Sequence, residues 1–185
     1  MTSPNRFADW TSQNVAISLS REARTALASR PNRLPAAFSA SGAESIRLPS
    51  GRVASIPLTR VRFDAWAGAP LSHTYNGKQI LDYHGRPAFA ELAILWSLSA
   101  NGWQGVWIDT YRRKVRTDYW GNPSVDHLPP APSQLLDRIF KRAGSRAGAW
   151  DVFAWSQLDV LFAESKRRGR DKIRLSQLRF LEAAM

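Results

Sequence analysis

The chain has 185 residues, with 26 lysine and arginine residues against 15 aspartate and glutamate residues, and so a formal net charge of +11. Its 44% hydrophobic and 22% charged residues are ordinary for a globular protein, which excludes extensive disorder. Cysteine is absent, so disulfides, thiolate metal sites and a cysteine nucleophile are excluded. No apolar run reaches the roughly 18–20 residues of a membrane span and the N-terminus is polar, so we expect a cytoplasmic protein.

The positive charge favours a polyanionic partner. Of the 26 basic residues 21 are arginine, whose planar fork of donors suits phosphate groups and stacks on bases. Nucleic acid is the commonest partner of such a chain, although a GC-rich genome would also enrich arginine. The excess is spread along the chain, with a net +6 over residues 1–80 and +5 over residues 81–185, so it does not belong to a basic tail.

The first 80 residues are predicted to form an N-terminal region of uncertain fold. In chain order, the pattern predicts a short helix over residues 20–29, a loop or arm over residues 30–43, one or two strands over residues 46–66, and turns over residues 67–85. A tight turn is expected at residues 49–51, and Asn76 and Gly77 are a candidate hairpin tip.

Residues 81–185 show a sharper pattern, typical of an α/β domain. The pattern predicts a first helix that begins at Pro87 and is closed by Asn101 and Gly102. Strands are then expected over residues 104–113 and 114–120, followed by a Pro-rich connection over 122–132 and a helix over 133–144. The last expected elements are strands over 151–155 and 159–165 and a final helix over 173–185. Glu91 is the one charged residue on the very apolar first helix.

The chemistry is expected at the two strands that follow residue 150. Asp151 opens the first strand, and Glu164 and Lys166 lie two residues apart near the end of the second, so both point to one face. In a hairpin, Asp151 and Glu164 would lie close together and raise each other's pKa, a conflict that a divalent cation such as Mg²⁺ or Mn²⁺ would relieve. With Lys166 beside them, these groups suit phosphodiester hydrolysis. The alternative is a hairpin edge with solvated charges.

The segments GAWDVFAW and DVLFAESKRRGRDKIRLSQLRFLEAA resemble the core of a PD-(D/E)XK nuclease of the VRR-NUC branch. The resemblance covers about residues 86–185, and its specific part is the block 148–184. It implies a restriction-endonuclease-like core, with a small mixed β-sheet flanked by helices. That core usually continues into a further strand after the last helix, so either the N-terminal region supplies this strand or the core is shortened.

The resemblance also implies roles for individual residues. Asp151 matches the first acid after a turn glycine, Gly148, although Trp150 stands where the family has proline. Glu164 and Lys166 match the Glu-x-Lys pair. The implied catalytic residues are Asp151, Glu164, Lys166 and Gln177, and the implied ligands of Mg²⁺ or Mn²⁺ are Glu91, Asp151, Glu164 and the backbone carbonyl of Ser165. The implied substrate is DNA, or RNA in some relatives, and we favour DNA.

Two basic clusters are expected to contact nucleic-acid phosphates. The first comprises Arg167, Arg168, Arg170, Lys172 and Arg174, and the second includes Arg112 and Arg113. The leading expectation is therefore a metal-dependent nuclease. A nucleic-acid-binding module built on a decayed nuclease fold is the main alternative, and a basic scaffold protein for RNA or a phage-type assembly is a third.

Overall fold

The computed structural model describes residues 38–72, 74, 77–119, 127–156, 159–167 and 169–185. It also describes the backbone of residues 13–19, which form a strand. The helix predicted over residues 20–29, the hairpin-tip residue Asn76, part of the Pro-rich connection and Arg168 lie outside the described residues.

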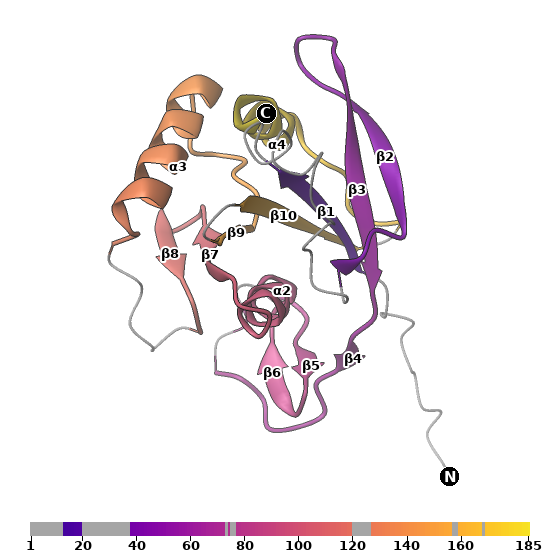
Figure 1. The fold of residues 1–185 in the computed structure, drawn as a ribbon. Helices are drawn as coiled ribbons and strands as arrows, with labels where there is room; N and C mark the ends of the chain where they lie inside the picture. Colours follow the sequence, from indigo (N-terminus) through magenta and orange to yellow (C-terminus); the bar gives the residue numbers. More distant parts are fainter. Residues whose placement is uncertain are drawn as a thin grey trace.

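A seven-stranded sheet forms the centre of the molecule (Figure 1). Its strands, in spatial order, are β2 (Gly42–Arg47), β3 (Val53–Val61), β1 (Gln13–Leu19), β10 (Val160–Arg167), β9 (Val152–Trp155), β7 (Gln104–Asp109) and β8 (Lys114–Arg116). The predicted α/β class is confirmed. Every described strand pair is antiparallel, which corrects the expected mixed sheet. Three of these pairs are joined by short turns, and such hairpins require their strands to run in opposite directions.

A second, three-stranded sheet comprises β4 (Asp64–Ala65), β5 (Leu81–Tyr83) and β6 (Arg86–Ala88). Pro87, expected to start a helix, instead lies in β6 opposite Asp82. The turn between these strands holds His84 and Gly85 at φ of 52° and 79°, the backbone that a two-residue hairpin turn requires. The helix α2 (Ala90–Ser99) therefore begins after this strand, and it ends before Gly102 as predicted.

Helices cover both faces of the seven-stranded sheet. The helix α2 packs on one face, and α3 (Pro130–Ala143) and α4 (Leu175–Ala184) pack side by side on the other (Figure 1). Alternate residues of β10 reach the two resulting cores: Leu161 and Ala163 face α2, whereas Phe162 faces α4. Glu164 continues this alternation and so points to the α4 face. No helix in the described part of the chain is long and apolar enough to cross a membrane.

The strand β1 joins the N-terminal region to the rest of the sheet. It pairs with β10 over its whole length, with Ala16 opposite Glu164, and its other edge pairs with β3. Residues before and after position 80 thus share one sheet. After β10 the chain forms α4, which ends at Ala184, and the strand beside β10 comes from the N-terminal region.

Candidate metal and catalytic site

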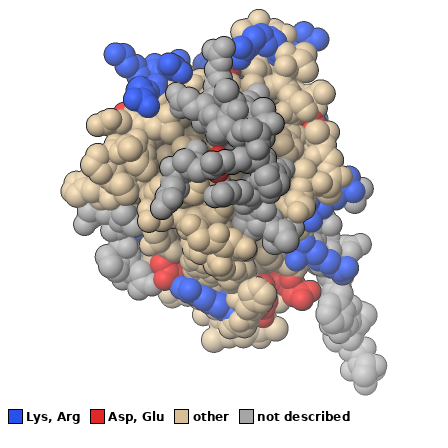
Figure 2. All heavy atoms as spheres, viewed as in Figure 1, with Lys and Arg blue, Asp and Glu red and all other residues tan. Residues whose placement is uncertain are grey.

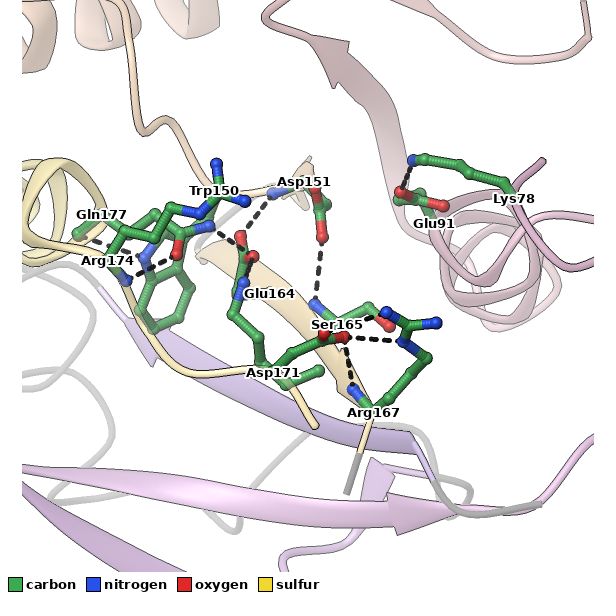
Figure 3. Close-up of polar contacts among 11 residues, drawn as sticks. Lys78, Glu91, Trp150, Asp151, Glu164, Ser165, Arg167, Asp171, Arg174 and Gln177 are labelled. Carbon is green, nitrogen blue, oxygen red and sulfur yellow. Dashed lines mark hydrogen bonds and ion pairs between the residues drawn. The ribbon is translucent and has the colours of Figure 1, made fainter. Parts of the chain in front are cut away.

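The β9–β10 hairpin brings Asp151 and Glu164 together, as predicted from their spacing. Ala163 pairs with Val152, so the next residues along each strand face one another. The Asp151 N–H donates to Glu164 Oε2 at 3.2 Å, and the Ser165 N–H donates to Asp151 Oδ2 at 3.1 Å (Figure 3). Each carboxylate is therefore held by a backbone N–H of the opposite strand, which orients both acids at the same end of the hairpin.

Glu164 is the centre of the polar group in Figure 3. Its residue is only 1% exposed, and its Oε1 accepts hydrogen bonds from Lys166 Nζ and from Gln177 Nε2. Lys166 comes from the same face of β10, and Gln177 comes from the first turn of α4. The structure thus brings together four residues predicted for catalysis: Asp151, Glu164, Lys166 and Gln177.

Gln177 links this group to the start of α4. Its side-chain Oε1 accepts a hydrogen bond from the Arg174 N–H at 3.0 Å, so the same side chain closes the helix N-terminus and contacts Glu164. The indole of Trp150 is fully buried and donates to the Gln177 carbonyl at 3.3 Å. Trp150 therefore anchors the residues just before β9, including Asp151, to the helix that carries Gln177.

The two acids are difficult to ionise together. Burial, the charge of Glu164 and the charge of Glu91 raise the pKa of the Asp151 carboxyl well above its usual range, against the opposing effects of Lys78 and the Ser165 N–H. Burial also raises the pKa of Glu164, although Lys166, the Asp151 N–H and Gln177 oppose this effect. The Asp151 carboxyl therefore favours its protonated form, and a further cation beside it would favour the carboxylate.

Glu91 lies on α2, on the side of Asp151 that is away from Glu164, and is 7% exposed (Figure 3). Figure 3 shows that its carboxylate accepts from Lys78 Nζ, and that this pair stands apart from the Glu164 group. Glu91 is near enough for its charge to raise the pKa of Asp151. Among the residues that the structure describes, however, no three acidic or histidine side chains gather as a metal-binding cluster.

Lys78 is a site residue that the sequence analysis missed. Its ammonium lies 5.9 Å from the ring centre of Phe89 and 5.4 Å from that of Trp107. Burial lowers its pKa, but the charge and hydrogen bond of Glu91, with the charges of Asp151 and Asp109, more than offset this effect and raise it. The available signal was Glu91 itself, because a carboxylate on an apolar helix needs a cationic partner.

The backbone of Ser165 suits the role that the resemblance implies for it. Its N–H points to the Asp151 carboxylate. In an extended strand, the N–H and C=O of one residue point to the same side, so its carbonyl is directed to the Asp151 side as well.

The predicted phosphate-binding residues differ in their exposure and in their ion pairs. Arg167 makes a two-pronged ion pair with Asp171, at 3.0 and 3.1 Å, while Arg170, Lys172 and Arg174 are exposed. In the second cluster, Arg112 Nη1 lies 3.6 Å from Asp109 Oδ2, and Arg113 is exposed. On the face shown in Figure 2, the basic side chains gather in separate groups at the margins.

The turn before Asp151 requires a glycine at position 148. Gly148 has a φ of +85°, and a Cβ placed there would lie 2.3 Å from the backbone carbonyl carbon of Ser176. We expect Gly148→Ala to lower the free energy of unfolding by about 2–4 kcal/mol, because it combines left-handed strain with a backbone clash. Gly144→Ala is the matched control, since Gly144 has a φ of +68° with open space around it, and should cost about 1 kcal/mol. Urea unfolding of both variants measures this, and equal losses would contradict the clash.

The site therefore combines oxygen donors, a neighbouring lysine and a glutamine from a helix start. Two adjacent carboxyl groups are suited to hold a hard divalent cation, and an adjacent ammonium is suited to stabilise an anionic group. Compared with known proteins, the chain matches no family model, no curated protein and no solved structure.

Proposed function

We propose that this protein is a metal-dependent nuclease that hydrolyses phosphodiester bonds in nucleic acid. The observation that carries the proposal is the contact of Asp151 with Glu164, and of Glu164 with Lys166, at one end of the β9–β10 hairpin. The resemblance of this block to the PD-(D/E)XK core and the charge of +11 support the same conclusion.

The donor set fits Mg²⁺ or Mn²⁺. Asp151 and Glu164 provide carboxylate oxygens, and the Ser165 carbonyl is directed to the same side, so all the candidate donors are hard oxygens. The raised pKa of Asp151 supports this fit, because carboxyls that resist ionisation beside one another are stabilised as carboxylates by a cation. Glu91 would join the set once it is released from Lys78.

A divalent cation held there would make water a stronger nucleophile and offset the negative charge that develops on the phosphate. Residues of the chain would then position the reacting groups and bind the substrate. The Lys166 ammonium would orient the attacking water and stabilise the phosphate oxygens, while Gln177 would hold Glu164 in position through its Nε2. The exposed side chains of Arg170, Lys172 and Arg174 would bind phosphates on either side of the cleaved bond.

The strand β1 supports a complete core. It occupies the edge of β10, so the N-terminal region provides a strand beside the one that carries Glu164 and Lys166.

A specific observation favours a second candidate function, a nucleic-acid-binding module without cleavage. Lys78 already provides a cation to Glu91, and a protonated lysine can replace a metal in neutralising a carboxylate.

The proposed activity is tested by incubating the purified protein with labelled single-stranded DNA, duplex DNA and RNA, with Mn²⁺, Mg²⁺ or EDTA. We expect cleavage with either metal and none with EDTA. Lys166→Met should lower the rate at least about a hundredfold, because it removes the charge that stabilises the phosphate. Lys141→Met, which removes a charge from the exposed surface of α3, is the control. Cleavage that survives EDTA, or that Lys166→Met leaves unchanged, would refute these roles.

A further inference from the structure

The turn between β7 and β8 presents an exposed aromatic ring beside basic side chains. Tyr111 is 85% exposed, and Arg112, Arg113 and Lys114 follow it directly. Arg113 has a φ of +55°, a left-handed conformation that costs a residue other than glycine about 1 kcal/mol. Arg112 lies against this ring, with its guanidinium carbon 5.5 Å from the ring centre. A strained arginine next to an exposed ring suggests a contact surface rather than a simple connection.

A basic pocket of about 460 Å³ lies beside this turn, between β8 and α3. Its polar lining comprises Arg113, Lys114, His127, Ser133, Asp137 and Arg146. Arg146 pairs with Asp137 at 3.2 Å, whereas none of the ion pairs among the described residues involves Arg113 or Lys114. A pocket of this size accommodates a ligand of nucleotide size, and the two cations favour a phosphate group.

This surface lies at the same end of the sheet as the candidate metal and catalytic site. The Ile108 N–H donates to the Asp151 carbonyl at 2.8 Å, so β7 ends beside the start of β9. Asp109, the last residue of β7, contributes to the charge around Lys78 and pairs with Arg112. A strand of nucleic acid that crossed the β7–β8 turn would therefore pass the end of the sheet at which Asp151 lies.

We propose that this surface binds single-stranded nucleic acid, with an unpaired base stacked on Tyr111 and a neighbouring phosphate in the pocket formed by Arg113 and Lys114. The proposal rests on the proposed nuclease function and names the class of its substrate. A single strand is favoured over a duplex because an exposed ring stacks on an unpaired base, whereas duplex bases are stacked on one another.

Fluorescence anisotropy with a short labelled oligothymidine, measured in EDTA so that nothing is cleaved, tests the stacking contact. Tyr111→Ala should weaken binding at least about fivefold, the lower limit expected for the loss of one stacked base. Tyr111→Phe keeps the ring and should bind within about twofold of the unaltered protein. Because Tyr111 is exposed, both variants should fold normally. Equal binding by the Ala and Phe variants would overturn the proposal.

Salt dependence tests the phosphate contact. The double variant Arg113→Gln and Lys114→Gln should reduce the slope of log affinity against log salt by about 0.7, the contribution of one phosphate contact to a single strand. An unchanged slope would overturn the assignment of a phosphate to this pocket.

Two comparisons decide between this substrate class and its competitors. Tyr111→Ala should leave binding to a blunt duplex unchanged, and polyglutamate should compete far less well than oligothymidine. An equal loss on the duplex would mean that the ring does not select unpaired bases. Equal competition by polyglutamate would mean that the surface recognises only negative charge. The binding proposal and the nuclease proposal can fail separately. Single-strand binding that depends on Tyr111, without Mn²⁺-dependent cleavage, would contradict only the proposed nuclease function.

Discussion

Asp151→Asn is expected to lower divalent-metal-dependent cleavage at least about a thousandfold and, at the same time, to stabilise the metal-free protein by about 1–2 kcal/mol. The loss of activity follows from the removal of a proposed metal ligand. The gain in stability follows because burial, Glu164 and Glu91 all disfavour the Asp151 carboxylate, and asparagine carries no charge there. For a chain of this length the gain corresponds to a rise in Tm of roughly 2–8 °C.

The gain in stability should depend on pH. Asp151 has a folded pKa above its unfolded value near 3.9, so the folded protein holds a proton that the unfolded chain releases. The stability of the unaltered protein therefore falls as pH rises from about 4 to the folded pKa, and asparagine removes this loss. The difference between the two proteins should be small near pH 3–4 and largest at neutral pH.

Urea unfolding in EDTA across this pH range measures the difference. Asp64→Asn is the matched control, because it removes the same charge from an exposed position in the small sheet and should leave stability nearly unchanged. A stability gain for Asp151→Asn that is largest at low pH would have the wrong sign for this explanation.

Lys78→Met is expected to destabilise the metal-free protein by about 1–3 kcal/mol, because it leaves the Glu91 carboxylate without its cationic partner. The side chain of Glu91 is only 9% exposed, whereas that of Lys78 is 41% exposed, so a value in the lower part of this range is expected. If Glu91 belongs to the metal site, Mn²⁺ should recover part of the lost stability, and the variant should bind Mn²⁺ more tightly than the unaltered protein.

The double variant Lys78→Met with Glu91→Gln separates the two effects. It removes the unpaired carboxylate, so it should regain stability in EDTA, but it should gain no more from Mn²⁺ than the unaltered protein does. Thermal unfolding with and without Mn²⁺ provides the comparison. If Lys78→Met has the same stability deficit with and without Mn²⁺, then Glu91 lies outside the metal site.

The parts of the site that are close in sequence could be predicted, and the parts formed by distant segments could not. Asp151 and Glu164 sit on neighbouring strands of one hairpin, so their spacing alone predicts that they meet. Gln177 follows in the next helix. Lys78 lies in a turn-rich segment whose position is set by the small sheet, and no local pattern connects it to Asp151.

The strand order of the large sheet likewise depends on contacts between segments that are distant in sequence. The pairing of β1 with β10 joins segments about 150 residues apart, and only tertiary packing determines it. The prediction of a helix start at Pro87 is wrong, because proline favours both the first turn of a helix and edge strands. The tight turn at His84 and Gly85 places Pro87 in a strand. The ion pair of Arg167 with Asp171, four residues away, is a contact that the basic cluster alone does not predict.

Calorimetric titration of Mn²⁺ into the unaltered protein and into Glu164→Gln tests the central claim most directly. Glu164 is the residue that contacts Lys166, Gln177 and the Asp151 N–H, so the metal site depends on it. We predict saturable Mn²⁺ binding with a dissociation constant below the millimolar range in the unaltered protein, weakened at least about tenfold by Glu164→Gln. No binding heat at millimolar Mn²⁺, or equal binding by both proteins, would contradict a metal site at Asp151 and Glu164.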